Sequence, residues 1–96
     1  MPPQRERANL SRAEDVRNAN DHIAKRAVRL HFISRVPMLC ECSDAACESI
    51  FLIALGNYTA LRPRGFLTAP GHNVQHATPA LREDDYWLHQ QLTTNN

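Results

Sequence analysis

Residues 39–47 read LCECSDAAC, and this short stretch holds all three cysteines of the 96-residue chain. Cys40 and Cys42 are two positions apart, so on an extended backbone their side chains project to the same side. The small, turn-forming residues that follow return the chain so that Cys47 can face them. Three thiolates this close repel one another unless a cation lies between them. The spacing therefore predicts a zinc site, because zinc accepts thiolate ligands in tetrahedral geometry.

A fourth ligand has to come from elsewhere in the chain, since no cysteine remains. His72 follows a proline-glycine turn that can aim its side chain back at a neighbouring loop. His76 is the rival, because two histidines four positions apart also resemble zinc-finger spacing. A site built with both histidines would leave Cys40 unused, although Cys40 is already well placed. The preferred ligand set is Cys40, Cys42, Cys47 and His72, for one structural Zn²⁺.

Other uses of the cysteines fit the sequence less well. Their polar neighbours argue against three thiols packed as core residues, and an iron–sulfur cluster usually takes four thiolates. A redox pair of Cys40 and Cys42 would be strained, but it stays open as an alternative. Catalytic zinc needs an open position and an acid/base group, and the chain has neither H-E-x-x-H nor the zinc-deaminase motif. Glu41 and Glu48 flank the ligands and are expected to be solvated. We expect a protein that is not an enzyme.

The composition is typical of a small folded domain whose hydrophobic core alone gives limited stability. Hydrophobic residues make up 43% of the chain and charged residues 22%. A chain of this length buries little surface, so a metal ion would stabilise it considerably. No apolar run approaches the roughly 18–20 residues that span a bilayer, and the first residues lack a signal peptide's apolar segment. We expect a cytoplasmic protein without membrane contact, with reduced thiols.

The first third of the chain predicts one long helix. Residues 8–31 contain neither proline nor glycine, and apolar residues recur there at spacings of three and four. We place the helix at residues 8–34, after a disordered leader at 1–7. Asn20 interrupts the apolar face, and we expect it to be a tolerated polar residue on a face partly in water.

Residues 35–90 predict a zinc-binding, β-rich domain, followed by a flexible tail at 91–96. Strands are expected at 36–42, 48–55 and 66–68, with a helical turn at 58–62 and a hairpin at 80–89. His89 is expected at the surface or its boundary. The fold class is α+β: a long N-terminal helix followed by a small antiparallel β-domain stapled by zinc.

Charge is distributed unevenly although the net charge is only +1. Residues 1–35 carry +4 and residues 36–96 carry −3, so only the first part could attract an anionic polymer. Arg17, Lys25, Arg26 and Arg29 are the candidate nucleic-acid contacts. Their wide angular spread, with acidic residues among them, is more typical of a mixed charged surface than of a nucleic-acid-binding stripe.

A resemblance supports the metal positions. The run PMLCECSDAACESIFLIAL at 37–55, Tyr58, Arg62 and the run GFLTAPGHNV at 65–74 resemble a group of small bacterial, actinobacterial-type, zinc-finger-like proteins. Those proteins share C-x-C-x4-C and P-G-H motifs. The likeness covers about residues 8–88 and implies the same three cysteines and His72 as ligands. It departs at 55–57, where the group more often has a threonine and acidic residues, and it implies no activity.

These observations favour a protein-interaction or adaptor module that docks on a larger protein assembly, with a protein partner that the sequence does not identify. A nucleic-acid-binding module using the Arg-rich helix is the alternative. A thiol-based zinc or redox sensor is a third.

Overall fold

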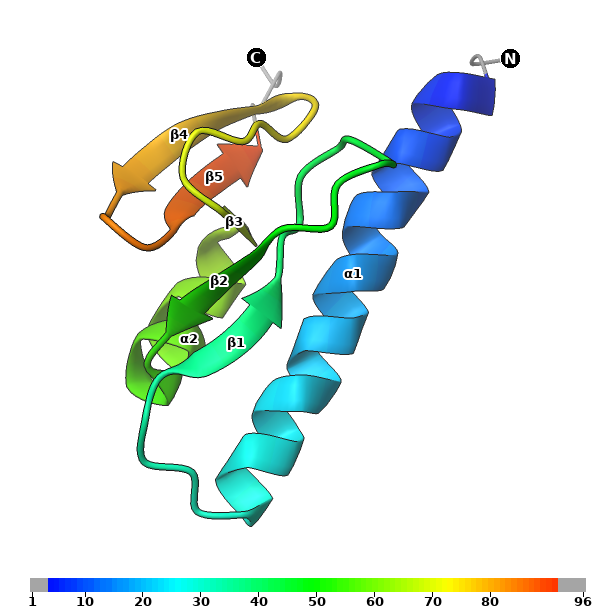
Figure 1. Cartoon of the computed structure of the whole chain (residues 1–96). Coiled ribbons are helices and arrows are strands. Elements are labelled where there is room, and N and C mark those ends of the chain that lie inside the picture. Colours follow the sequence, from blue (N-terminus) through cyan, green and yellow to red (C-terminus); the bar gives the residue numbers. More distant parts are fainter. Residues whose placement is uncertain (1–3, 92–96) are drawn as a thin grey trace.

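The computed structural model describes residues 4–91, and it describes side chains from residue 12 onward. One long helix lies along one side of two small antiparallel sheets (Figure 1), so the expected α+β class is confirmed. The elements are α1 (Gln4–Arg29), β1 (Val36–Leu39), β2 (Ile50–Ile53), α2 (Leu55–Leu61), a 3-10 helix η1 (Arg62–Arg64), β3 (Phe66–Thr68), β4 (Ala77–Arg82) and β5 (Trp87–Gln91).

Strands β1 and β2 form a two-stranded ribbon whose register follows the apolar pattern. Val36 lies opposite Ile53, and Met38 opposite Phe51; all four side chains are buried. Because successive side chains alternate between the two faces of a strand, the intervening positions point outward. The outer face is therefore apolar and exposed, a feature taken up below.

The second sheet has the order β3-β5-β4, so β5 is its central strand. Leu67 of β3 lies opposite Leu88 of β5, and both are fully buried. Gly65, just before β3, allows a close approach to the central strand: a Cβ there would lie 2.0 Å from the backbone oxygen of His89. His89 itself is fully buried, with Nε2 2.9 Å from Thr68 Oγ1, so its expected surface position is wrong.

The bounds of α1 differ from the expected range of 8–34. The helix includes residues 4–7 of the expected leader, while residues 1–3 lie outside the described part of the chain. It ends at Arg29 because the backbone turns left-handed at His31, with φ of 55°. The His31 and Phe32 amides donate to the carbonyls of Val28 and Ala27, the paired bonds of a Schellman motif. Residues 30–34 are therefore a connection rather than helix.

Helix α2 begins earlier than the expected helical turn and shortens the strand before it. It includes Gly56 and Asn57, which lie between the expected strand at 48–55 and the expected helical turn at 58–62. Its buried residues are Tyr58 and Leu61. At the other end of the chain, Gln91 closes β5, and the rest of the predicted tail, 92–96, lies outside the described residues.

The main core joins α1 to both sheets. Its buried members are Ala27, Val36, Met38, Phe51, Ile53, Tyr58, Leu61, Leu67, Tyr86 and Leu88. Ala27 belongs to α1, so the helix packs on the same hydrophobic core as residues 35–90. Within residues 4–91 no helix combines the length and apolar character needed to cross a membrane.

Candidate metal centre

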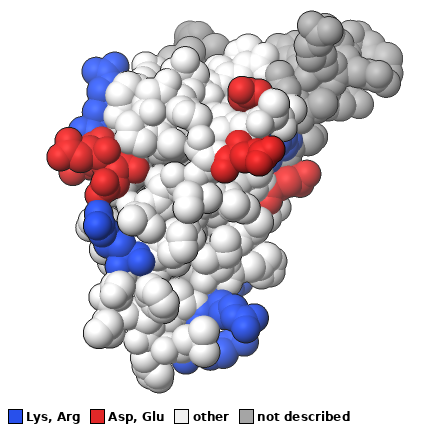
Figure 2. Space-filling view, viewed as in Figure 1, with Lys and Arg blue, Asp and Glu red and all other residues white. Residues whose placement is uncertain are grey.

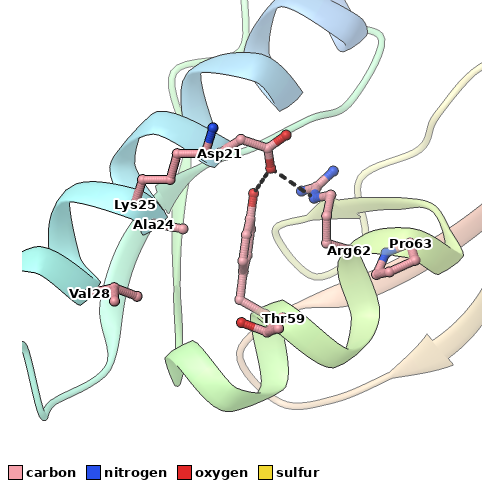
Figure 3. Close-up of a pocket in the computed structure, with 8 residues that line it drawn as sticks. Asp21, Ala24, Lys25, Val28, Thr59, Arg62 and Pro63 are labelled. Carbon is pink, nitrogen blue, oxygen red and sulfur yellow. Dashed lines mark hydrogen bonds and ion pairs between the residues drawn. The ribbon is translucent and has the colours of Figure 1, made fainter.

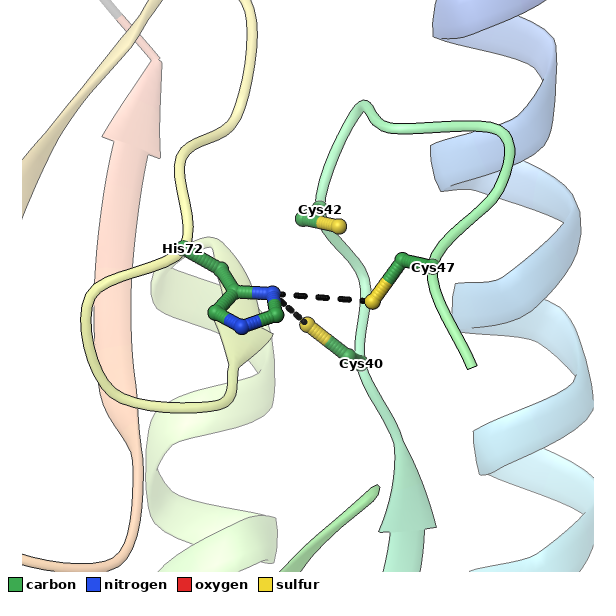
Figure 4. A group of neighbouring side chains, drawn as sticks. All are labelled: Cys40, Cys42, Cys47 and His72. Carbon is green, nitrogen blue, oxygen red and sulfur yellow. Dashed lines mark hydrogen bonds between the residues drawn. The ribbon is translucent and has the colours of Figure 1, made fainter. Parts of the chain in front are cut away.

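Four side chains with metal-ligating atoms converge where the cysteine loop meets the loop after β3. The sulfurs of Cys40, Cys42 and Cys47 and a ring nitrogen of His72 all lie within 4.8 Å of one another. Figure 4 shows the imidazole pointing from its own loop toward the three sulfurs. The structure thus brings together the four residues of the preferred set, and His76 is not part of the group. The cluster could hold a metal ion and is compatible with a structural zinc site.

The two short sulfur–nitrogen distances in the cluster involve the same nitrogen. His72 Nδ1 lies 3.4 Å from Cys40 Sγ and 3.5 Å from Cys47 Sγ. A single ring nitrogen carries at most one proton, so it cannot donate separately to two sulfurs. A ring nitrogen that faces two sulfurs at once is compatible with a common centre that all of them ligate.

A tight turn carries His72 to this centre. The His72 amide donates to the carbonyl of Ala69 across 3.2 Å, with Pro70 and Gly71 between them. Gly71 has φ of +84°, the left-handed value that a type II turn requires at its third position. Proline fixes the second position, so the sequence Pro-Gly-His aims the imidazole with little conformational freedom.

The cysteine loop is shaped by its own hydrogen bonds. The Asp44 carboxylate accepts from the Ala46 amide at 2.9 Å, and the Asp44 carbonyl accepts from the Cys47 amide at 3.0 Å. Two further amides point at sulfur: Ala69 donates to Cys40 Sγ at 3.3 Å. Ser49 donates to Cys47 Sγ at 3.5 Å. Amides aimed at sulfur stabilise the thiolate form and orient the ligands.

Arg12 ties the loop to helix α1, a role that the sequence did not reveal. Its guanidinium donates to the carbonyl oxygens of Cys40, Cys42 and Cys47, at 3.4, 2.5 and 3.1 Å. One side chain therefore fixes the backbone of all three cysteines. Five N–H donors in a planar fork make arginine suited to such a role.

The expectation that Glu41 is solvated is wrong. It is fully buried and points away from the sulfurs, because it alternates with the two flanking cysteines. Its carboxylate accepts from Arg62 at 3.2 and 2.5 Å, from the Leu67 amide at 2.8 Å and from Asn20 Nδ2 at 2.7 Å. The buried charge is thus paired and its oxygens are satisfied.

Asn20 was also wrongly expected to lie partly in water. It is fully buried, and its amide forms bonds of 2.8 Å with both the N–H and the C=O of Leu39. The side chain pairs with the backbone of β1 as a neighbouring strand would. It fixes the strand on helix α1 immediately before the first cysteine.

The cysteines differ in how readily they lose a proton. Burial raises the pKa of the Cys40 thiol to about 12 and also raises the pKa of Cys42. Burial also acts to raise the pKa of Cys47, but hydrogen bonds from the Ser49 amide and with Cys42 and Cys40 outweigh it and lower the pKa to about 7. Without a cation, the buried thiols therefore stay neutral at pH 7 while Cys47 is partly ionised.

The candidate nucleic-acid contacts are not gathered into one patch. Arg17 lines a hollow beside β5, Lys25 lines a separate groove between α1 and α2, and Arg26 and Arg29 are exposed. Nucleic-acid binding through these residues stays a prediction. No family model, curated protein or solved structure matches the chain significantly, so the site is assessed from its own geometry.

Proposed function

We propose that the protein is a non-enzymatic interaction module held together by one structural zinc ion. The observation that carries the proposal is the convergence of three sulfurs and one imidazole nitrogen from two separate loops. Tetrahedral zinc has Zn–S distances of about 2.3 Å and Zn–N of about 2.0 Å, which places neighbouring sulfur and nitrogen ligands about 3.5 Å apart. The sulfur–nitrogen distances of 3.4 and 3.5 Å agree with that value.

A structural role follows from the number and origin of the ligands. Four protein ligands fill the tetrahedral positions and leave none for substrate. The ligands join the segment after β1 to the turn after β3, so the ion would link the two sheets. A second set of bonds supports this link: the Ser43 amide donates to the Asn73 carbonyl at 3.0 Å, and Ser43 Oγ accepts from the Gln75 amide at 2.6 Å.

Docking on a partner is supported by apolar side chains that the fold leaves exposed. At the end of α1 and in the loop after it these are Val28, Leu30, Phe32 and Ile33; on the outer face of the ribbon they are Leu39, Ile50 and Leu52. Ile33 is 98% exposed. Figure 2 shows a broad uncharged area over β1 and β2 with charged groups at its margins. Apolar surface gathered in this way is typical of interaction sites.

A groove between α1 and α2 adjoins this end of the molecule. It has a volume of about 430 Å³, and its lining includes Ala24, Val28 and Pro63 (Figure 3). One wall is rigid, because Tyr58 donates to the Asp21 carboxylate, which also lies 3.4 Å from Arg62 Nε. Burial and the bond to Asp21 raise the pKa of Tyr58, so it remains a neutral donor. The preformed apolar groove suits a side chain of a partner protein.

Site-specific photo-cross-linking in the native host tests the docking role. A photoreactive amino acid is placed at Ile33, and in a matched variant at Glu14, an exposed position elsewhere on α1. We expect a defined covalent adduct with one protein from position 33, lost on the further change Leu30→Asp while zinc content is retained. Equal adducts from both positions, or none from position 33, would contradict the docking role.

A further inference from the structure

A second hollow lies on another part of the surface, between α1, η1 and β5. It has a volume of about 610 Å³ and is lined by Arg17, Pro63, Arg64, Gly65, Phe66, Gln90 and Gln91. Two of these residues are cationic, two are amides, and none is acidic. The hollow is thus positively charged and rich in hydrogen-bond donors, unlike the apolar groove beside α2.

The two guanidinium groups have no acidic partner among the described residues. The ion pairs there involve Arg35 and Arg62 only. Asp21, one helical turn from Arg17, is bonded instead to Tyr58 and lies near Arg62. A concave surface lined by one sign of charge concentrates its electric field, which favours an anion. Both cations are therefore available to a ligand.

The hollow is held in shape by the packing around it. The Arg17 guanidinium lies over the Phe66 ring, 5.3 Å from its centroid, and Phe66 is buried. Gly65 is pressed against β5, where any Cβ would clash with the His89 carbonyl. Arg64 comes directly before Gly65 and Gln90 directly after His89, and both line the hollow. The Arg17 guanidinium is thus positioned before any ligand arrives, which reduces the entropy lost on binding.

We propose that this hollow binds a phosphate group, and that Arg17 and Arg64 provide the charge-assisted hydrogen bonds. Planar guanidinium groups bind phosphate oxygens in pairs, and the amides of Gln90 and Gln91 can donate to the remaining oxygens. The volume accommodates a pyrophosphate or a nucleotide as well as one phosphate of a nucleic-acid backbone. The proposal is independent of the metal site and of the apolar docking surface.

The test is a titration of the ¹⁵N-labelled protein with inorganic pyrophosphate, followed by amide chemical shifts. We expect saturable shifts at Gly65, Phe66 and Gln90, weakening as salt is added. Arg17→Gln and Arg64→Gln should each lower the affinity about tenfold. Arg26→Gln is the matched control, since Arg26 is an exposed arginine of the same helix outside the hollow. It should leave the affinity unchanged.

Parallel titrations with a nucleoside diphosphate and a single-stranded RNA oligonucleotide distinguish the source of the phosphate. Shifts at the same amides with the diphosphate alone identify a free nucleotide; tighter binding of the oligonucleotide, weakened by Arg64→Gln, identifies a nucleic-acid backbone. Absence of shifts at these amides up to about 10 mM pyrophosphate overturns the proposal. Equal affinity in the folded Arg17→Gln, Arg64→Gln and Arg26→Gln proteins does so as well.

Discussion

Two glutamates flank the cysteines of the candidate metal cluster, and one is buried while the other is exposed. Glu41 lies between the first two cysteines and is fully buried, accepting hydrogen bonds from Arg62, Asn20 and the Leu67 amide. Glu48 follows the third cysteine and is exposed. The burial of Glu41 follows from the alternation of side chains along extended backbone. Cys40 and Cys42 point to the candidate metal site, so Glu41 between them points to the opposite side.

We expect Glu41→Gln to lower the free energy of unfolding by about 3 kcal/mol. The change leaves the Arg62 charge, with only 12% of its side chain exposed, without its main partner and sets an amide N–H₂ against other donors. Glu48→Gln should change stability by less than about 0.5 kcal/mol. Denaturant unfolding of the zinc-loaded proteins measures both. Equal effects of the two substitutions would contradict the role assigned to Glu41.

Replacing Gly65 or Gly56 by alanine should have opposite effects on stability. A Cβ at Gly65 meets the His89 carbonyl at 2.0 Å, whereas a Cβ at Gly56 meets nothing within 4 Å. Gly65→Ala should destabilise the fold by about 3 kcal/mol, since backbone rather than a side chain must move. Gly56→Ala, within helix α2, should stabilise it by up to about 1 kcal/mol. Thermal unfolding compares the two. A Gly65→Ala protein as stable as the wild type would refute the close approach.

The four residues of the candidate metal cluster were predictable from the sequence, but the residues that support them were not. Cysteines at short spacing and a histidine after a proline-glycine turn carry a local signature. Arg12, Asn20 and Glu41 act through partners 19 to 35 positions away. No local pattern distinguishes them from solvated residues. Such contacts depend on how α1 lies across the cysteine loop.

At the scale of elements, helix α1 and strand β1 are joined by side chain to backbone bonds. Asn20 satisfies the N–H and C=O of Leu39, and Arg12 binds the carbonyls of the cysteine loop. At Leu39 the edge of β1 is thereby paired with the helix, so these backbone groups are not open to another strand. The helix is therefore part of the framework that positions the cysteines of the candidate metal cluster.

Asn20→Ala should cost about 2–3 kcal/mol of stability, because the partly buried N–H and C=O of Leu39 lose their partner and the buried Glu41 carboxylate loses a donor. Asn18→Ala is the matched control: the same residue type on the same helix, but exposed. It should be nearly neutral. Hydrogen exchange of the Leu39 amide gives a local measure, and it should accelerate only in Asn20→Ala. Unchanged exchange in that variant would rule out the proposed strand-like pairing.

The elements themselves were largely predictable, and their ends were not. Apolar periodicity indicated the helix, and the strand at 66–68 was placed with its observed bounds. The end of α1 depends on the left-handed backbone of His31, which is an uncommon conformation for a non-glycine residue. The start of α2 depends on packing that buries Tyr58 and Leu61, and this overrides the turn preference of Gly56 and Asn57.

At the scale of the whole molecule, metal binding should be coupled to pH. In the metal-free protein Cys40, with a pKa near 12, holds its proton at pH 6 and at pH 8, whereas Cys47, with a pKa near 7, holds it mainly at pH 6. Ligation displaces these protons, so zinc affinity must rise as pH rises. The pKa of Cys47 predicts about 0.8 more protons released at pH 6 than at pH 8 from this thiol.

Calorimetric titration with zinc in buffers of different ionisation enthalpy measures this release. We expect the difference between pH 6 and pH 8 to shrink by about 0.8 proton in Cys47→Ser, because this variant lacks the thiol that titrates near pH 7. A difference that is the same in the wild type and in Cys47→Ser would contradict a Cys47 thiol that titrates near pH 7 and gives up its proton to the ion.

The most direct test of the account is zinc-edge X-ray absorption on the reduced, tag-free protein as purified, with the zinc content of the same sample determined. The account predicts one zinc per chain, surrounded by three sulfurs at about 2.3 Å and one imidazole nitrogen at about 2.0 Å. A sample without stoichiometric zinc, or a shell of two sulfurs and two nitrogens as a site using His76 would give, would contradict it.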